Sequence, residues 1–377
     1  MEQMEIRDIY EQLPEVRLAL NTKVFDFGIA VDSRERFHLV WSEYSPDTEE
    51  VKIYSRVFHE NEWEPPILVY EGQNRSPDVN ITVAHDDKIH LLLTGAKGLV
   101  YELGFKTYNG TSWGPETTIV EVETSTFGHN IAASHRTNEI YVVYGDYNER
   151  HYFPYILTAI FTGHTSKEFG KLFLIQGNGM FWIDPIRITK RGRFSCTNPK
   201  ICLCDKESVL NIAWEDERNG YWTREVYYDS FSQKEFSGNR RVSENRNEGH
   251  SPLITCDDEN NVYLLWNSSK NEELNVLWYR ERIDNIWSES LKLPDRGIAN
   301  SIGVDNLRNV HIMWANEDRI FLKMKIDSVW SDAIIFDGMN AKSFVDTANN
   351  IHILQLNFRN EKQSVFTYRK FVWKGTV

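Results

Sequence analysis

From about residue 24 to the end of the chain, short apolar stretches with a period of two alternate with polar breaks. This alternation predicts β-strands that bury one face, and the Asp-, Asn- and Glu-rich breaks predict tight turns between them. Before this region, the apolar residues from Met4 to Leu13 follow a helical spacing that Pro14 would end. The chain is therefore predicted to be all-β, with a short helical or extended segment at its N-terminus.

The clearest pattern is a sequence repeat, present in seven copies, in which a polar turn is followed by an apolar strand. In residues 257–266 a turn that begins with Asp257 leads into a strand that ends on Trp266. The second strand position of the seven copies is occupied by His38, His90, Tyr141, Asn211, Tyr263, His311 and His352. Successive copies are 52, 51, 70, 52, 48 and 41 residues apart. A period of roughly 40–50 residues is typical of propellers and solenoids.

Each repeat contains four strand-like pieces, and the last piece of most repeats opens on Trp. We therefore predict a seven-bladed β-propeller of four-stranded antiparallel blades over residues 23–377. The blades are expected near residues 24–72, 73–122, 123–190, 191–244, 245–295, 296–338 and 339–377. Little chain remains for the outer strand of the last blade. Residues 1–22 are therefore expected to cap the ring, and they could supply the strand that closes it.

Composition narrows the classes of partner. The chain has 377 residues, of which 41% are hydrophobic and 13% aromatic, so a packed core is expected. Its net charge of −13 argues against nucleic acid as a partner. No apolar run approaches the ~18 residues of a membrane span, so membrane insertion is not expected.

Location is predicted from the N-terminus and the cysteines. Residues 1–20 contain acidic side chains and no apolar core of a signal peptide. The four cysteines do not have the spacing of a disulfide framework. A cytoplasmic location is expected, and an extracellular or cell-surface location after removal of a leader or by another export route is the alternative.

The repeated phrase Asp-x-x-x-Asn-x-His/Tyr-x-x-Trp, followed by an outer strand that opens on Trp, resembles the sialidase-like (BNR-repeat) β-propeller superfamily. Residues 214–220, Trp-Glu-Asp-Glu-Arg-Asn-Gly, also resemble a phrase of those repeats. The resemblance extends from about residue 24 to residue 373 and implies the propeller fold. It leaves function open, because the superfamily includes sialidases, polysaccharide lyases and non-catalytic lectins.

The chain departs from the sialidases in two places. Their Asp-box, Ser-x-Asp-x-Gly-x-x-Trp, is present only in degenerate form at residues 108–113 and 284–287. Their Arg-Ile-Pro triplet is not matched, because Arg17 is followed by Leu-Ala. We therefore assign neither the arginine triad nor the Tyr/Glu nucleophile pair of sialidases to residues of this chain, and we predict no catalytic residue.

Candidate ligand-binding residues follow from propeller geometry. The loops that lead into the innermost strands and those that leave the second strands gather at one mouth of the central channel. The candidates in these loops are Arg75, His129, Asn130, Asp146, Glu215, Asp216, Arg218 and His250. Their amide, imidazole, carboxylate and guanidinium groups suit hydroxyl-rich ligands. A structural interpretation stands beside this one, because inner strands must turn tightly there and Glu215, Asp216 and Arg218 can form an ion pair within one blade.

No metal site or cofactor is expected. His38, His90, His311 and His352 occupy one repeat position, and their blades are rotated apart around the ring. They are therefore interpreted as packing residues.

Three functions fit the sequence. The first is a non-catalytic glycan-binding propeller, favoured because no single constellation of acid, base and nucleophile stands out. The second is a carbohydrate-active enzyme. A polysaccharide lyase would use His129 or Tyr144 as base with Arg75 or Arg218 as neutraliser. A glycoside hydrolase would use two carboxylates, Asp146 with Asp216 or Glu215. The third is a scaffold that binds another protein through its acidic surface or an insertion at residues 145–180.

Overall fold

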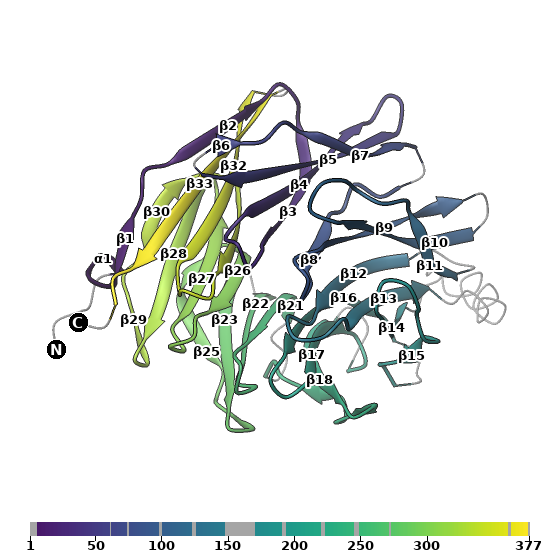
Figure 1. The fold of residues 1–377 in the computed structure, drawn as a ribbon. Helices are drawn as coiled ribbons and strands as arrows, with labels where there is room; N and C mark the ends of the chain where they lie inside the picture. Colours follow the sequence, from purple (N-terminus) through teal and green to yellow (C-terminus); the bar gives the residue numbers. More distant parts are fainter. Residues whose placement is uncertain are drawn as a thin grey trace.

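The computed structural model describes residues 6–60, 62–73, 75–97, 100–122, 126–147, 170–190, 194–219, 223–244, 249–270, 273–360 and 363–375. Within these residues the chain forms seven antiparallel sheets and one helix of four residues. The sheets stand around a common axis as the blades of a propeller (Figure 1). This confirms the predicted all-β, seven-bladed fold.

Every blade begins with an inner strand and continues outward through a second and a third strand. The inner strands of blades 1 to 7 are β3 (Val24–Val31), β8 (Asn80–Val83), β12 (Thr126–Ala133), β16 (Cys196–Cys204), β21 (Gly249–Cys256), β26 (Ile298–Val304) and β31 (Asn340–Val345). The second strands are β4 (Phe37–Ser45), β9 (Ile89–Lys97), β13 (Ile140–Tyr147), β17 (Val209–Asp216), β22 (Val262–Lys270), β27 (Val310–Asn316) and β32 (Ile351–Asn360). The third strands are β5 (Glu50–His59), β10 (Val100–Tyr108), β14 (Gly170–Gly177), β18 (Glu225–Ser232), β23 (Glu273–Ile283), β28 (Arg319–Ile326) and β33 (Gln363–Trp373).

The outer strand of four blades consists of two short pieces that both pair with the third strand. These pieces are β6 (Glu62–Trp63) and β7 (Ile67–Gly72), β19 (Glu235–Phe236) and β20 (Arg240–Arg241), β24 (Ile286–Trp287) and β25 (Leu291–Arg296), and β29 (Val329–Trp330) and β30 (Ile334–Asp337). Blades 2 and 3 have one outer strand each, β11 (Thr117–Val122) and β15 (Ile186–Arg187).

The N-terminal segment supplies the outer strand of the last blade. β1 (Tyr10–Gln12) and β2 (Val16–Leu20) both pair antiparallel with β33. The helix predicted from the apolar spacing is limited to α1 (Ile6–Ile9), because Tyr10–Gln12 enters the ladder instead. Pairing with a strand already in the ring gives these residues more backbone hydrogen bonds and packing than a short isolated helix would.

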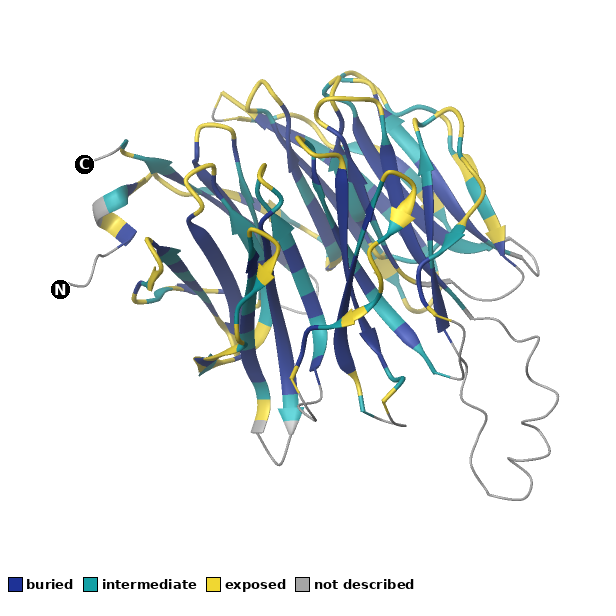
Figure 2. Ribbon diagram, turned by 90° about the horizontal axis from the view of Figure 1, so that it is seen from below, coloured by how far each residue is buried: buried dark blue, intermediate teal, exposed yellow. Residues whose placement is uncertain are grey.

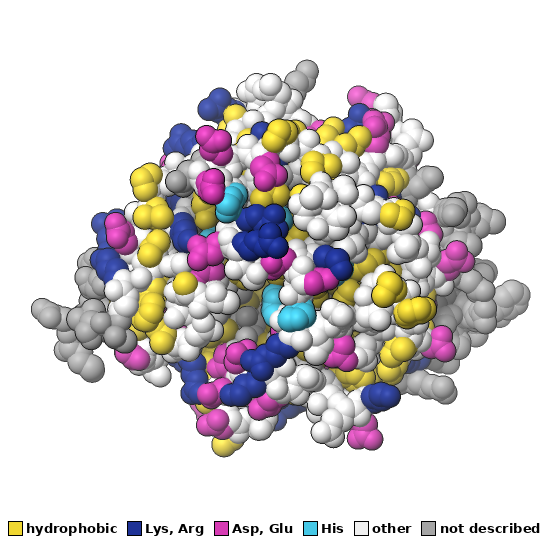
Figure 3. All heavy atoms as spheres, viewed as in Figure 1, with side chains coloured by type: hydrophobic (Ala, Val, Ile, Leu, Met, Phe, Trp, Pro, Cys, Tyr) yellow, Lys and Arg dark blue, Asp and Glu magenta, His cyan; other side chains and the backbone are white. Residues whose placement is uncertain are grey.

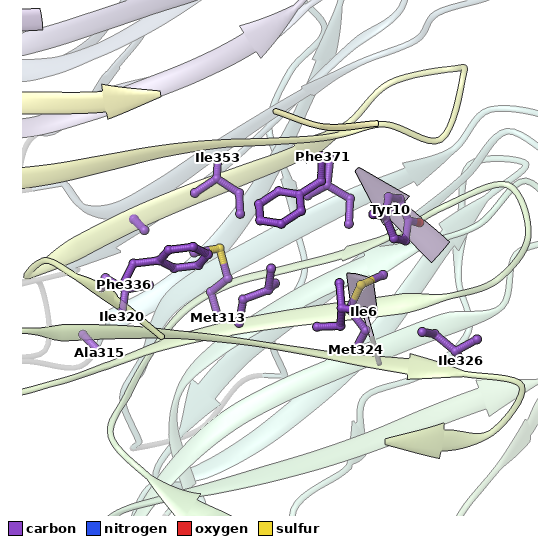
Figure 4. Packing of buried hydrophobic residues seen from close by; sticks show 13 residues of the cluster. Ile6, Tyr10, Met313, Ala315, Ile320, Met324, Ile326, Phe336, Ile353 and Phe371 are labelled. Carbon is purple, nitrogen blue, oxygen red and sulfur yellow. The ribbon is translucent and has the colours of Figure 1, made fainter. Parts of the chain in front are cut away.

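Ile6 and Tyr10 anchor this segment. Both are buried, and they lie among residues of blades 6 and 7 such as Met313 and Phe371 (Figure 4). The Tyr10 hydroxyl donates a 2.9 Å hydrogen bond to Asp305 Oδ2 in the turn between β26 and β27. The two ends of the chain are therefore joined by a ladder, an apolar cluster and a buried polar contact.

The repeated Asp organises the turn between the inner and second strands. In blade 7, Asp346 Oδ1 accepts hydrogen bonds from the backbone N–H groups of Ala348 and Asn350 at 2.9 and 2.8 Å. The residue between them, Asn349, has a left-handed backbone with φ of 65°. The same pattern recurs in other blades around Asp32, Asp257 and Asp305. This local geometry explains why the Asp recurs at one position of the repeat.

The repeated His is part of the same turn in two blades. His352 and His38 place Nε2 2.9 Å from Oδ2 of Asp346 and Asp32, respectively. His311 contacts Ser343 and His90 contacts Thr107 instead. All four imidazoles are buried at separate places around the ring. Among the residues that the structure describes, no group of three or more His, Cys, Asp or Glu side chains is arranged to hold a metal ion.

The core lies between blades. The largest fully buried side chains include Trp214, Trp266 and Trp314, which lie at one repeat position in the second strands of blades 4 to 6. Figure 2 shows burial concentrated in the middle of the blades and exposure at the turns. In the described part of the chain, no helix is long and apolar enough to cross a membrane.

The contacts of Tyr10 predict a large loss of stability on truncation. Tyr10→Ala should lower the unfolding free energy by about 3–5 kcal/mol, because a cavity opens between blades 6 and 7. Tyr10→Phe keeps the packing and should cost only about 1 kcal/mol for the lost hydrogen bond. Chemical denaturation of the three proteins measures both values. Equal effects of the two variants would show that the packing does not anchor the ring.

Buried histidines predict a loss of stability in mild acid. Burial lowers the pKa of His90 and of His311 to about 4 from the usual 6.5. Between pH 6.5 and pH 4 the unfolded chain binds protons at these positions and the folded chain does not, so stability should fall as pH falls through this window. His311→Gln should make the fall in melting temperature from pH 7 to pH 5 shallower than in the unaltered protein. Parallel pH profiles would contradict the assignment.

Candidate functional site

The inner strands of five blades carry a β-bulge close to where they begin. At each bulge the inner strand has one residue more than the stretch of the second strand that it faces. The bulges lie at residues 25–26, 128, 198–199, 251–252 and 300. Three bulges contain a left-handed residue at equivalent places in consecutive blades, with φ of 52° at Gly128, 51° at Asn198 and 53° at Ser251. Bulges redirect side chains and often lie beside functional sites. We call this end of the channel the strand-start mouth.

Polar side chains at the strand-start mouth connect neighbouring blades. Asn130 Nδ2 donates to Asn80 Oδ1 at 3.0 Å, and Asn130 Oδ1 accepts from the backbone N–H of Ile201 at 3.0 Å. Asn130 therefore joins blades 2, 3 and 4. Glu215 Oε1 accepts from the backbone N–H of Ser251 at 2.8 Å and joins blades 4 and 5.

The connections continue around the ring. Asn267 Oδ1 accepts from the backbone N–H of Ala299 at 2.9 Å, which joins blades 5 and 6. Asn300 Nδ2 donates to Asn340 Oδ1 at 3.0 Å, which joins blades 6 and 7. The small polar residues at these positions therefore hold the ring together.

Three predicted site residues lie inside blades in ion pairs. Asp216 is fully buried and accepts hydrogen bonds from Trp214 Nε1 at 2.9 Å and Arg218 Nη2 at 2.5 Å. The Arg218 guanidinium also lies over the Tyr227 ring at 4.1 Å. Arg75 is 2.7 Å from Glu102 and also pairs with Glu116. These contacts give Asp216, Arg218 and Arg75 a structural role.

Two further predicted residues lie at the same end of the ring. Asp146 is half-buried near the end of β13, where its backbone pairs with Thr126 and Lys171. His250 is half-buried at the start of β21, with Nε2 3.1 Å from Ser269 Oγ. The predicted insertion at residues 145–180 falls mainly on residues 148–169, which lie outside the described residues.

His129 is a predicted residue that is buried but takes part in no ion pair among the described residues. It is 6% exposed, and its buried Nε2 has no hydrogen-bond partner among the described residues. Burial lowers the His129 pKa to about 4, although Asp78 and Asp26 act in the opposite direction. The imidazole is therefore neutral at pH 7, and Nε2 can accept or donate a hydrogen bond according to its tautomer.

Tyr144 stands opposite His129 in the ladder between β12 and β13. Its side chain is buried, and burial together with the Asp146 carboxylate raises the Tyr144 pKa well above its usual value. The phenol is therefore protonated at pH 7 and available only as a hydrogen-bond partner or proton donor.

A charged group accompanies His129 that the sequence analysis did not identify. Lys200 follows the bulge of β16. Its pKa is lowered, mainly by burial and also by Lys342, and the carboxylates of Asp26, Asp78 and Glu215 oppose this shift only in part. Lys342 Nζ lies 3.3 Å from Asp26 Oδ1. Two ammonium groups and three carboxylates from blades 1, 2, 4 and 7 therefore lie within electrostatic range of one another. One sequence signal was available, because Lys200 and Lys342 lie at or just beyond the polar residues that begin their strands.

Asp26 also fixes the geometry of this group. Its Oδ2 accepts a 2.9 Å hydrogen bond from the backbone N–H of Val79 in blade 2. The Asp26 backbone N–H donates to Ser42 Oγ at 3.2 Å. Asp26 thus joins blades 7, 1 and 2 and holds the Lys342 ammonium at the mouth.

A cavity of about 670 Å³ lies at the opposite end of the channel, which we call the turn mouth. It is lined by the turns that join inner and second strands, roughly 20–25 Å along a strand from the strand-start mouth. Its acidic groups have partners within the fold, such as His352 for Asp346 and the backbone N–H of His135 for Asp205. Figure 3 shows basic, acidic and histidine side chains interspersed on one face of the molecule, without a broad area of one charge.

Neither a protein-family profile nor a curated protein sequence matches this chain. The fold is similar to that of a PL25 ulvan lyase, with a TM-score of 0.59 and 10% identity over 95% of this chain and 96% of that chain. The polysaccharide lyase Uly1 has a TM-score of 0.58 and 9% identity over 92% and 89% of the two chains. An α-L-arabinanase of Penicillium chrysogenum, determined with arabinobiose, has a TM-score of 0.53 and 9% identity over 87% and 98%.

These similarities concern the fold. They confirm the propeller fold that the resemblance implied. The structural neighbours named here are carbohydrate-active propellers. At 9–10% identity they do not transfer a substrate or a catalytic residue to this chain.

The contacts at the mouth predict opposite effects of two substitutions on stability. Asn130→Ala should cost about 1–3 kcal/mol, because it leaves Asn80 and the backbone N–H of Ile201 without their partner. Lys200→Met should leave the melting temperature unchanged or raise it, because it removes a desolvated charge. Thermal denaturation of both variants tests this separation. A destabilised Lys200→Met protein would place Lys200 among the structural contacts.

Proposed function

We propose that this protein binds carbohydrate at the strand-start mouth of the propeller. The observation that carries the proposal is the buried His129 Nε2 without a partner, close to the charged group of Lys200, Lys342, Asp26 and Asp78. Sugars present both hydrogen-bond donors and acceptors on every ring, so a site that mixes ammonium, imidazole and carboxylate groups complements them. The carbohydrate-active propellers with similar folds support this class of ligand.

Binding without catalysis is the function we favour. A glycoside hydrolase needs two carboxylates that reach the scissile bond. The carboxylates of Asp216 and Glu215 already have partners, because Asp216 is paired with Arg218 and Glu215 accepts from the backbone N–H of Ser251 in blade 5. Arg75 and Arg218, the predicted neutralisers of a lyase substrate, are held by acidic partners within their blades.

A polysaccharide lyase is the second candidate, favoured by the adjacency of His129 and Tyr144. In such a reaction a neutral base removes the proton beside the uronate carboxylate, and a protonated group assists departure of the leaving sugar. His129 is neutral and Tyr144 is protonated, as these roles require. Lys200 would then neutralise the substrate carboxylate in place of the predicted arginines. A protein partner remains the third hypothesis.

Affinity electrophoresis tests the proposal. Native gels containing ulvan, polygalacturonate, alginate or arabinan should retard the protein in at least one case. His129→Gln and Lys200→Met should each weaken retardation about fivefold, as expected for the loss of one hydrogen bond of about 1 kcal/mol. His85→Gln, at the turn mouth, is the matched control and should migrate as the unaltered protein does.

A parallel assay separates binding from catalysis. The ultraviolet absorbance of the unsaturated uronate product should stay constant during incubation with the same acidic polysaccharides. A rise that His129→Gln abolishes would replace the binding function by a lyase. Free migration in every gel without new absorbance would contradict both and favour a protein partner.

A further inference from the structure

Two aromatic side chains of blade 1 are exposed at the strand-start mouth. Phe25, at the start of β3, is 55% exposed, and Tyr44, near the end of β4, is 38% exposed. Their ring centroids are 6.1 Å apart with an angle of 73° between the planes. This edge-to-face contact fixes the two rings against each other. Single exposed aromatics are ordinary on protein surfaces, but a paired and oriented set at a candidate site calls for a ligand interpretation.

The backbone that carries Phe25 is held on both sides. Phe25 and Asp26 are the two bulge residues that face Ser42. Val24 is buried, and its backbone N–H donates to Ser364 Oγ of blade 7 at 2.9 Å. Asp26 is fixed by Val79 and Lys342 of the two neighbouring blades. The exposed ring therefore projects from a rigid support, which reduces the entropy lost when a ligand covers it.

The chemistry beside these rings identifies the class of ligand. A pyranose has an apolar face of C–H groups and a rim of hydroxyl groups. The face of one ring can cover the C–H groups while the other ring, at 73° to it, contacts the side of the sugar. The adjoining Asp26 carboxylate and Lys342 ammonium, which are about one-quarter and one-third exposed, can bond the hydroxyl rim. Where β16 and β26 begin, the chain offers Asn198 and Ile298 instead of an aromatic residue.

We propose that Phe25 and Tyr44 form a stacking platform for a pyranose ring of the glycan, an inference that rests on the proposed function. The platform belongs to blade 1, whereas His129 and Lys200 belong to blades 3 and 4. The Asp26–Lys342 pair lies next to the platform and also interacts with Lys200. The site therefore extends across the mouth, and its ligand is an oligosaccharide of several units rather than a single sugar.

The experiment compares Phe25→Ala and Tyr44→Ala with a matched control. Phe181→Ala removes an equally large ring that is 75% exposed in the hairpin between β14 and β15, at the other end of the blades. The readout is retardation in gels containing ulvan, polygalacturonate, alginate or arabinan. Phe25→Ala should weaken binding about fivefold to tenfold, the effect expected from losing about half of the burial of a Phe side chain. Phe25→Tyr should retain binding, and Phe181→Ala should not change it.

Each outcome bears on the inference. Weaker retardation of both alanine variants, with unchanged melting temperatures, supports the platform. Equal retardation of Phe25→Ala and the unaltered protein overturns the platform and leaves the proposed function intact. Free migration of the unaltered protein in every gel overturns the proposed function and the platform together. If Phe25→Ala unfolds, Tyr44→Ala and Phe25→Tyr decide, because a platform requires loss in the first and retention in the second.

Discussion

Closure of the ring is the constraint on which the rest of the structure depends. Each blade buries its faces against two neighbours, so an open ring would expose the facing surfaces of blades 1 and 7. The antiparallel pairing of β1 and β2 with β33 completes the last blade from the first residues of the chain. The Tyr10–Asp305 hydrogen bond and the cluster around Ile6 attach the same segment to blade 6. A short terminal segment therefore stabilises contacts made by the whole ring.

The same constraint shapes the strand-start mouth. Neighbouring inner strands converge there, and their polar groups need partners. Asn130, Glu215, Asn267 and Asn300 meet that need by bonding across blade boundaries. A polar residue at this mouth is therefore first a structural contact. The proposed ligand site uses His129 and Lys200, together with the Asp26–Lys342 pair, which also joins neighbouring blades.

This division also explains why the fold alone does not define a reaction. The similar propellers include lyases and a glycanase, and each chemistry needs its own side chains on a common support. Here Asp216, one member of the predicted acidic pair, is fully buried in an ion pair with Arg218, whereas the neutral His129 imidazole is in no ion pair among the described residues and the aromatic pair of blade 1 is exposed. This contrast is the reason why we propose recognition of a sugar chain rather than its hydrolysis.

The sequence by itself determined the seven repeats, the all-β fold and the turns, because these rest on local interactions. Asp346 bonds backbone groups two and four residues away, so its recurrence is visible in the sequence. The fate of the N-terminal segment was decided by tertiary structure, since Tyr10–Gln12 becomes a strand only through pairing with β33. The site was decided in the same way. Lys342 and Asp26 are 316 residues apart, and a bulge that no motif marks sets the direction of Lys200. Local patterns identify which residues stand where strands begin. Only the closed ring decides which of them form hydrogen bonds to neighbouring blades and which are left for the proposed ligand, because those bonds join residues that are far apart in the sequence.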